Sequence, residues 1–418
     1  MMRTPVVVAI SALTLTLAAC GSGSSDGKVK LRMIESLTSP ERTKLIKSLI
    51  ADFEKANPTI DVELISPPLE SADQKITQIL QTKKDLDVLE VRDLTAKQFS
   101  NNGWLGELPT AQWAGWSDLT ELAQKKAAEV GGKPYLIPYG FYMKTMFYRT
   151  DLGVTAPPKT WDELYAAAKA MTKDGKYGYS FRGGKGGAGY ATLMISAYNG
   201  DQINPDKSFF LKDKRTMFST PQAAQALELY VKLFKDVSPP DSVAWSYPEM
   251  VQGFTSGVTG ILIQDPEVIK TVQESGLKNW ATAPIPKGPT GYALQNVGYA
   301  GWGITSFTAH KAEAVKLVEF LSEAKQSTAF AKGNSLMPIS KTAQSDPQFS
   351  QGAWKAYLDA QQDPNQVITI APTDYPGFSK FQVDSDRDIQ ALITGKTTVA
   401  DVLKSWDAFW TDQGKKVS

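Results

Sequence analysis

The stretch that decides the fold is KVKLRMIESLTSPERTKLIKSLIADFEKANPTIDVELI, residues 28–65. Apolar and polar residues alternate at its start and again at its end, which predicts two strands. Between them, Ser39 can cap a helix that begins at Pro40, and apolar side chains recur at helical spacing as far as Phe53. Residues 71–91 repeat the helical pattern and then the strand pattern. This β-α-β-α-β order predicts an α/β protein built on a parallel sheet.

Two later stretches lack a helical period and are rich in residues that favour strands and turns. They are GGKPYLIPYGFYMKTMFYRTDLG, residues 131–153, and WATAPIPKGPTGYALQNVGYAGWGITSF, residues 280–307. We interpret each as the chain passing from one lobe to another. A chain of 418 residues also favours two lobes over a single core.

The amino-terminal end has the pattern of an exported protein. Arg3 precedes an apolar run over residues 6–19, which is shorter than the ~20 residues of a membrane span. Next comes Cys20, the sole cysteine, at the end of LAAC, and then a Gly/Ser-rich tether. LAAC resembles a bacterial lipobox, so we expect residues 1–19 to be a signal peptide and residues 20–28 a tether lipidated at Cys20. The alternative is an ordinary signal peptide with a stray cysteine.

Composition narrows the classes of function. Lys and Arg total 45 and Asp and Glu 44, so there is no bulk charge to favour nucleic acid or broad adsorption to anionic lipid. His310 is the sole histidine, which excludes a multi-histidine metal site. No nucleophile signature such as G-x-S-x-G lies near it, so a Ser/His hydrolase is disfavoured. We expect no cofactor and no metal.

A series of segments, spread in order over nearly the whole exported part of the chain, carries a family likeness. These are LAAC (17–20), GGKPYLIPYGFYMKTMFYRTDLG (131–153), APPKTWDELYAAAKAMTKDGKYGY (156–179), MVQGFTSGVTGILIQDPEVI (250–269), WATAPIPKGPTGYALQNVGYAGWGIT (280–305) and KAEAVKLVEFLSEAKQ (311–326). Together they resemble the extracellular solute-binding proteins of ABC importers, in the carbohydrate-binding family that includes maltose-binding protein.

The resemblance implies an α/β fold of the two-lobe, periplasmic-binding-protein-like kind (type II), with hinge-crossing segments. We expect lobe 1 to hold residues 29–137 and 285–340, and lobe 2 residues 138–284 and 341–418. The ligand would lie between the lobes and close them by contacting both. A membrane permease of an ABC transporter would recognise the closed form. The expected protein is a monomer outside the cytoplasm, held at the cell membrane by its lipid.

Polar residues at strand ends are the first candidate ligand contacts, because open α/β sheets bind ligands there. The resemblance places Glu35, Asp93 and Asp265 at cleft-facing positions and a sugar-binding side chain close to Tyr142. A surface carboxylate remains the alternative for Glu35, and hinge packing remains the alternative for the tyrosine.

Aromatic residues in irregular segments are the second group. A sugar presents apolar C–H faces that suit an aromatic ring, and a rim of hydroxyls that suits charged or planar polar groups. Trp245 and Tyr247 lie in a polar loop, Trp302 lies between two glycines, and Phe378 lies in DYPGFSKF. We predict that these rings stack on the ligand.

The stretch FRGGKGGAGY, residues 181–190, contains G-x-G-x-x-G before a predicted helix. A dinucleotide fingerprint is disfavoured because the motif lies in mid-chain and no acidic residue follows at a well-supported ribose position. A flexible loop entering a helix is the plain interpretation. A third hypothesis is that backbone N–H groups with Arg182 and Lys185 receive an anionic group on the ligand.

Three functions compete at this point. The first is a lipid-anchored sugar receptor, with a neutral di- or oligosaccharide as the default ligand. The second is an extracellular glycoside hydrolase, which needs two carboxylates across a sugar bond and has Glu35, Asp93 and Asp265 to draw on. The third is a structural or adhesive lipoprotein, for which repeats or a sandwich-like strand pattern are expected, and neither is present.

Overall fold

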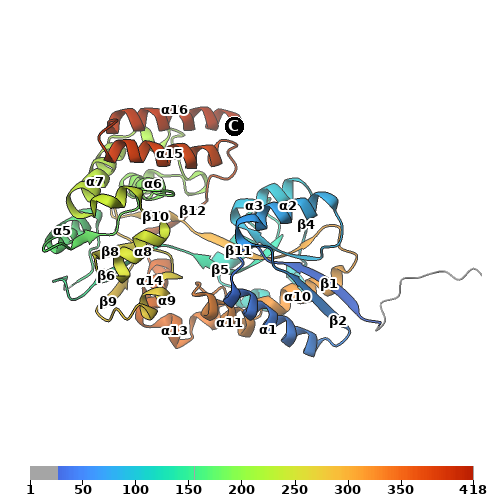
Figure 1. Ribbon diagram of the computed structural model, residues 1–418. Coiled ribbons are helices and arrows are strands. Elements are labelled where there is room, and N and C mark those ends of the chain that lie inside the picture. Colours follow the sequence, from blue (N-terminus) through green and yellow to red (C-terminus); the bar gives the residue numbers. More distant parts are fainter. Residues whose placement is uncertain (1–26, 155, 418) are drawn as a thin grey trace, which may run out of the picture.

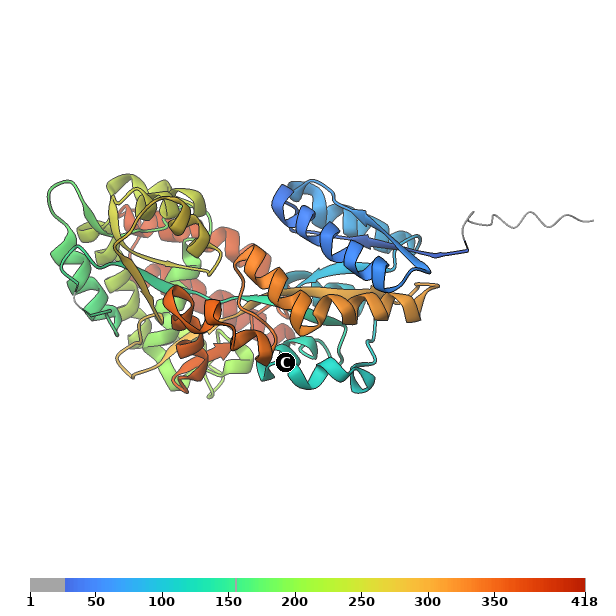
Figure 2. The ribbon, with the colours of Figure 1, turned by 90° about the horizontal axis from the view of Figure 1, so that it is seen from below.

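The computed structural model describes residues 27–154 and 156–417, and it divides into two α/β lobes (Figure 1). The predicted signal peptide and Cys20 lie outside the described residues. The view from below shows the same division, with a narrow middle crossed by strands and by the segment that follows α11 (Figure 2). Within the described ranges, no helix has both the length and the apolar character needed to cross a bilayer.

Lobe 1 is built on a sheet with the order β2-β1-β3-β11-β4, and β5 pairs with β11. The first three strands are parallel, as the opening β-α-β-α-β pattern predicts, while β11 runs antiparallel to its neighbours. The strands are β1 (Val29–Ile34), β2 (Ile60–Ile65), β3 (Val88–Arg92), β4 (Leu105–Gly106), β5 (Leu136–Tyr142) and β11 (Gly298–Thr305).

Helices cover both faces of this sheet (Figure 1). Helix α1 begins where predicted: Ser39 Oγ accepts a hydrogen bond from the Arg42 N–H at 3.3 Å, and Pro40 occupies the first turn. Its apolar face buries Ile46 and Phe53 against α10 and α11. The helices of this lobe are α1 (Pro40–Ala56), α2 (Ala72–Thr82), α3 (Asp93–Asn101), α4 (Glu121–Ala127), α10 (Lys311–Ser322) and α11 (Ala324–Asn334).

Lobe 2 is built on a sheet with the order β7-β8-β6-β9, and β10 and β12 form a separate parallel pair. The strands are β6 (Thr145–Arg149), β7 (Tyr177–Tyr179), β8 (Thr259–Gln264), β9 (Trp280–Ala283), β10 (Ala293–Asn296) and β12 (Gln366–Thr369).

The last two long helices, α15 and α16, stack over α6 and α7 at the top of lobe 2 (Figure 1). The helices of lobe 2 and of its approach are α5 (Trp161–Met171), α6 (Ala188–Asn199), α7 (Pro221–Val237), α8 (Tyr247–Thr255), α9 (Val268–Glu274), α12 (Lys341–Gln344), α13 (Pro347–Ser350), α14 (Lys355–Gln362), α15 (Phe378–Ile393) and α16 (Val399–Val417).

The chain passes between the lobes at the two stretches predicted and once more after α11. The first passage lies between β5, which pairs with β11 as far as Tyr142, and β6, which begins at Thr145. The second runs from β9 through β10 into β11. Strand β5 therefore continues past residue 137, where the sequence places the edge of lobe 1. The passages bring the end of β5 and the start of β11 to the side of lobe 2.

Candidate functional site

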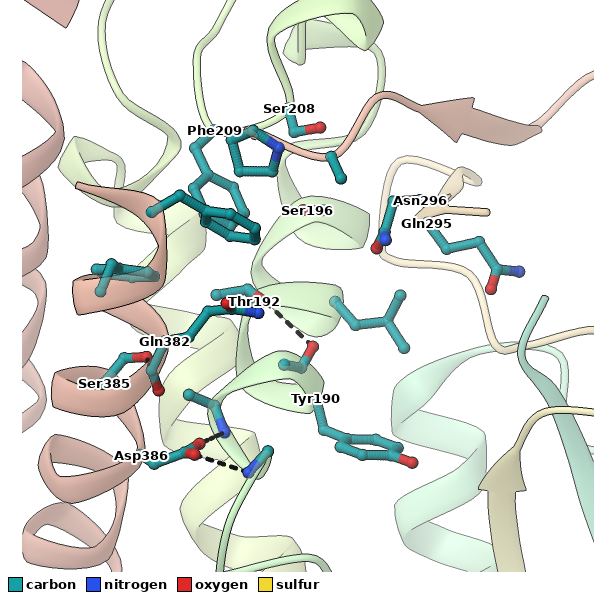
Figure 3. Close-up of a pocket in the computed structure, with 18 of the residues that line it drawn as sticks. Tyr190, Thr192, Ser196, Ser208, Phe209, Gln295, Asn296, Gln382, Ser385 and Asp386 are labelled. Carbon is teal, nitrogen blue, oxygen red and sulfur yellow. Dashed lines mark hydrogen bonds between the residues drawn. The ribbon is translucent and has the colours of Figure 1, made fainter. Parts of the chain in front are cut away.

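A cavity of about 830 Å³ lies between α6 and α15 and reaches the two strands that pass between the lobes (Figure 3). One wall is α6 with the glycine-rich turn before it, and the opposite wall is α15. Strand β10 contributes Gln295 and Asn296, and lobe 1 contributes Tyr142 and Gly298. The cavity is therefore lined by elements that lie far apart in the sequence.

An ion pair stands where the first passage meets lobe 2. Lys144 Nζ lies 3.4 Å from both carboxylate oxygens of Asp265, at the end of β8. Burial opposes the charge on Lys144, but the Asp265 carboxylate raises its pKa above the ordinary value. The two side chains remain 30% and 16% exposed. Both side chains are therefore open to the cavity, and they offer a donor and an acceptor to ligand hydroxyls.

The same lysine ties the two passages together through its backbone. The Lys144 N–H donates to Gln295 Oε1 at 2.8 Å, and Gln295 Nε2 donates to the Lys144 carbonyl at 3.1 Å. The Lys144 ammonium also lies 5.8 Å from the centre of the Tyr190 ring on α6. Motion at the hinge would therefore move polar groups of the cavity wall.

The glycine-rich turn before α6 is occupied by a carboxylate of the protein itself. Asp386 on α15 accepts hydrogen bonds from the Gly186 N–H at 2.7 Å and the Ala188 N–H at 3.0 Å (Figure 3). Arg182 folds over the same turn, and its Nε donates to the Lys185 carbonyl at 2.7 Å. Two of the N–H groups that the sequence offers to an anionic ligand therefore already have a carboxylate partner.

The far end of the cavity combines aromatic rings with hydroxyl groups. Phe209 lies there with Thr192, Ser196 and Ser208 (Figure 3), and Phe378 is a further aromatic residue of the cavity lining. Phe209 is held from behind by rings of the lobe 2 core, with Trp410 4.7 Å away between centroids. Rings for apolar faces beside hydroxyls for polar rims are the surfaces that a sugar requires.

On the lobe 1 side, Asp93 begins α3 directly beside the cavity lining. A methyl group built on Gly298 would lie 3.4 Å from Asp93 Oδ2. Burial raises the pKa of Asp93 to about 6, although the Leu94 N–H, at 2.8 Å, stabilises the ionised form. Asp93 is thus a carboxylate in need of a donor, at the edge of the space where a ligand would touch lobe 1.

The sequence model of the bacterial extracellular solute-binding protein family matches residues 39–328. The chain belongs to this family.

Other solute-binding proteins share the two-lobe fold over nearly their whole length. The maltose-bound MalE3 of T. maritima has a TM-score of 0.72 and 20% identity, over 93% of this chain and 99% of that chain. A cyclo/maltodextrin-binding protein complexed with maltotetraose has a TM-score of 0.75 and 21% identity, over 94% and 98%. The GacH receptor of Streptomyces glaucescens has a TM-score of 0.74 and 17% identity, over 93% and 100%.

Relatives found by sequence span the same length. A binding protein of Brucella abortus (strain 2308) is 25% identical over 93% of this chain and 94% of its own. An uncharacterized lipoprotein of Streptomyces antibioticus is 22% identical over 97% and 92%. These comparisons agree with the two-lobe fold of the described residues.

Five residues that the sequence singles out line the cavity of this solute-binding protein: Tyr142, Arg182, Lys185, Asp265 and Phe378. Asp93 lies next to the lining. They come from β5, the glycine-rich turn, the end of β8, the start of α15 and the start of α3, and the fold brings them to one region.

Glu35 is placed inside lobe 1. Its carboxylate accepts from Thr43 Oγ1 and Ser66 Oγ, each at 2.6 Å, and lies 3.9 Å from Arg42 Nε. The side chain has no exposed surface. In this structure Glu35 belongs to a buried ionic cluster rather than to the cavity wall.

Trp302 is also buried in lobe 1, at 1% exposure, with Tyr139 5.1 Å away between ring centroids. The sequence argument was that its glycine neighbours expose a face of the ring. The structure gives those glycines another purpose, because a methyl on Gly301 would lie 2.3 Å from the Ile137 carbonyl oxygen. The glycines let β5 approach β11 closely, and the ring packs into the core.

Trp245 and Tyr247 stand at the start of α8, outside the cavity lining. Trp245 Nε1 donates to Asp241 at 3.2 Å, and the Tyr247 hydroxyl donates to Glu267 Oε1 at 2.9 Å. Burial and then the Asp265 charge raise the pKa of Glu267. The polar groups of both side chains therefore donate hydrogen bonds to carboxylates of the protein itself.

Sequence reasoning missed Lys144, Tyr190 and Asp386. Lys144 had a usable signal, because it is the one charged residue within YMKTM, residues 142–146, between two predicted strands. Tyr190 follows the glycine-rich turn, but no pattern in the sequence marks it as a cavity residue. Asp386 had no signal, since it is one of several charged residues on a polar helix. Among the described residues, no group of three or more His, Cys, Asp or Glu could hold a metal ion.

Proposed function

We propose that the protein is an extracytoplasmic receptor that binds a carbohydrate in this cavity and delivers it to the permease of an ABC importer. The observation that carries the proposal is the cavity itself. An ion pair stands where the passages between the lobes meet it, and rings with hydroxyls line its far end. The structural neighbours include proteins described with maltose, maltotetraose and α-D-tagatose bound. A relative from Deinococcus radiodurans, 26% identical over 52% of this chain, carries the name "Probable ABC transporter-binding protein".

Each lining residue has a proposed task. Asp265 and Lys144 hydrogen-bond adjacent sugar hydroxyls, Tyr142 contacts the ligand at the hinge, and Phe378 stacks on an apolar face. Arg182 donates from the glycine-rich turn. Asp93 completes the site from lobe 1, so that the ligand stabilises an arrangement in which both lobes touch it.

The remaining predicted contacts act indirectly in this proposal. Glu35 and Trp302 hold lobe 1 rigid beneath the site. Trp245 and Tyr247 fix the start of α8 and the carboxylate of Glu267. The neutral di- or oligosaccharide remains the proposed ligand class, because the turn that would receive an anion is filled by Asp386.

The membrane anchor is proposed from the sequence alone. We propose that Cys20 carries lipid and that the receptor works at the outer face of the cell membrane. Replacing Cys20 with serine is expected to release the protein from the membrane fraction and to abolish its labelling by radioactive palmitate. Unchanged labelling of this variant would refute the anchor without touching the binding proposal.

The binding proposal is tested by thermal-shift screening of the full chain, purified in detergent, against neutral oligosaccharides, monosaccharides and polyols. A ligand at a hundredfold excess over its dissociation constant stabilises the protein by about 2.7 kcal/mol. Chromatography of the recovered ligand separates a receptor from the glycoside hydrolase alternative, because a receptor returns the sugar intact. A panel without any stabilising sugar, or a cleaved product, would contradict the proposal.

A further inference from the structure

The carboxylate of Asp386 caps α6 from a distant part of the chain. Helix α6 has a glycine before it, Gly187, which supplies no side-chain cap. Asp386 reaches the turn from α15 and accepts the Gly186 and Ala188 N–H groups. A helix amino terminus and a run of free N–H groups together attract a negative charge. Here the carboxylate of Asp386 supplies that charge.

Asp386 also lines the cavity, where it lies between α15 and the turn (Figure 3). Each of its two oxygens accepts one backbone hydrogen bond, whereas an ionised carboxylate has about four lone-pair sites. The carboxylate is thus fixed in place and keeps acceptor capacity for further donors. A pre-oriented acceptor of this kind loses little freedom when it binds a hydroxyl group.

We propose that Asp386 is the specificity-determining residue of the cavity: it fills the anion-binding turn and converts that wall into an acceptor for hydroxyl groups. The cavity therefore takes an uncharged carbohydrate and rejects phosphorylated, sulfated or carboxylated ones. The carbohydrate part of this inference rests on the proposed function, whereas the rejection of anions at the turn does not.

Among the described residues, four basic side chains line the cavity, and two of them have acidic partners. Lys144 is paired with Asp265, and Arg387 is paired with Asp384 on its own helix. Arg182 uses its Nε on the Lys185 carbonyl. An anionic ligand at the turn would meet the Asp386 charge at short range and would find its two N–H groups already used.

The first experiment uses inorganic sulfate as the probe, so that no sugar is needed. The melting temperature of the full chain in detergent is measured in sodium sulfate and in sodium chloride of equal ionic strength. The wild type is expected to show only the general effect of sulfate on proteins. Asp386→Ala empties the turn and is expected to show an additional, saturable sulfate-dependent rise.

Two further variants keep this test decisive. Asp412→Ala removes the same charge from an exposed position of α16, and it is expected to behave as the wild type. Asp386→Asn keeps the shape of the side chain, so it serves if the alanine variant does not fold, and a smaller sulfate-dependent rise is expected. The inference is overturned if the wild type already shows the saturable rise, or if neither Asp386 variant gains it.

The second experiment uses the neutral sugar identified by thermal-shift screening. Asp386→Ala is expected to bind it about ten- to a hundredfold more weakly, which is typical for the loss of a hydrogen bond to a charged group. A sulfate gain without any sugar binding would contradict the proposed function but not the role of Asp386 at the turn. Sugar binding that is unchanged in Asp386→Ala would contradict the role of Asp386 as a sugar acceptor.

Discussion

Each lobe has a charged cluster near the end of a buried strand, and the two clusters differ in how far their side chains are buried. In lobe 1, Arg42 lies 3.1 Å from Glu90 and 3.9 Å from Glu35, and all three side chains are almost fully buried. In lobe 2, Lys144 and Asp265 pair at 3.4 Å and stay partly open to the cavity.

The lobe 1 cluster is closed off by the protein itself, although Glu35 Oε2 and Arg42 Nε, 3.9 Å apart, make no hydrogen bond. The Arg42 guanidinium lies over the rings of Tyr139 and Phe330, 4.9 and 4.8 Å from their centroids. Burial alone would raise the pKa of Glu90, but the Arg42 charge, the Tyr139 hydroxyl and two backbone N–H groups hold it below the ordinary value. Such a cluster has little left to offer a ligand, whereas the lobe 2 pair keeps free donors and acceptors. A structural cluster therefore differs from a binding one in whether the protein itself buries and pairs the charged groups. Residue type and position at a strand end do not separate the two.

The largest effect is expected from opening the buried cluster. Arg42→Leu leaves two buried carboxylates without their cation and is expected to lower the free energy of unfolding by about 3–5 kcal/mol. Urea unfolding followed by circular dichroism measures the loss. The control is Lys30→Ala, which breaks an exposed pair with Glu63 and should cost less than about 1 kcal/mol. Equal losses of unfolding free energy in Arg42→Leu and Lys30→Ala would contradict a structural role for the buried cluster.

The lobe 2 pair is expected to matter for binding more than for stability. Asp265→Asn removes a charged acceptor and should weaken sugar binding about ten- to a hundredfold, with a change in unfolding free energy below about 1.5 kcal/mol. Isothermal titration with the sugar identified by screening measures the affinity. Asp151→Asn, which disrupts a pair with Arg149 outside the cavity lining, should bind as the wild type. An unaltered affinity in Asp265→Asn would remove this pair from the site.

The raised pKa of Asp93 predicts a dependence of affinity on pH. A ligand hydroxyl that donates to the ionised carboxylate binds better as the pH rises through about 6. Affinity at pH 5 should therefore be about tenfold lower than at pH 7.5, as follows from that pKa. Titration calorimetry at the two pH values measures the difference, which Asp93→Asn should reduce. A difference that persists in the variant would assign the pH dependence to another group.

The same carboxyl group affects the stability of the ligand-free protein in the opposite direction. Its pKa is higher in the folded chain than the ordinary value of 3.8. The folded state therefore holds the proton more tightly, and the contribution of Asp93 to stability is lost as the pH rises from about 4 to about 6. Urea unfolding of the wild type and of Asp93→Asn across this interval isolates the contribution.

The smallest effect is expected at the rim, where Lys97 on α3 pairs with Asp374 in the segment before α15. This exposed pair joins the two lobes. Lys97→Ala should weaken sugar binding by at most about fivefold, and salt should suppress the difference because exposed pairs are screened. Affinities at low and high sodium chloride provide the measurement. Lys355→Ala, whose partner Asp359 lies on the same helix, should bind as the wild type, and a larger loss in that control would refute the rim contact.

The sequence predicts those cavity residues whose place follows from the strand and passage patterns around them. Asp265 ends a predicted strand of lobe 2, where open α/β sheets bind ligands, and Tyr142 lies in a predicted passage between the lobes. The same rule placed Glu35 in the site, but α1 brings Arg42 over the end of β1 and closes it. Trp302 shows a second limit, because glycines beside a ring permit either exposure or the close approach of another strand.

The sequence by itself determined the α/β class, the parallel opening of lobe 1 and the two passages between the lobes. Those features follow from periodicity, capping and strand patterns, which act over a few residues. Tertiary structure alone decided which charges are open to a ligand. Asp386 lies 200 residues from the turn that it occupies, and no local pattern connects the two. Burial and partner satisfaction arise only when distant segments pack, and they decide whether a charged side chain is free to bind.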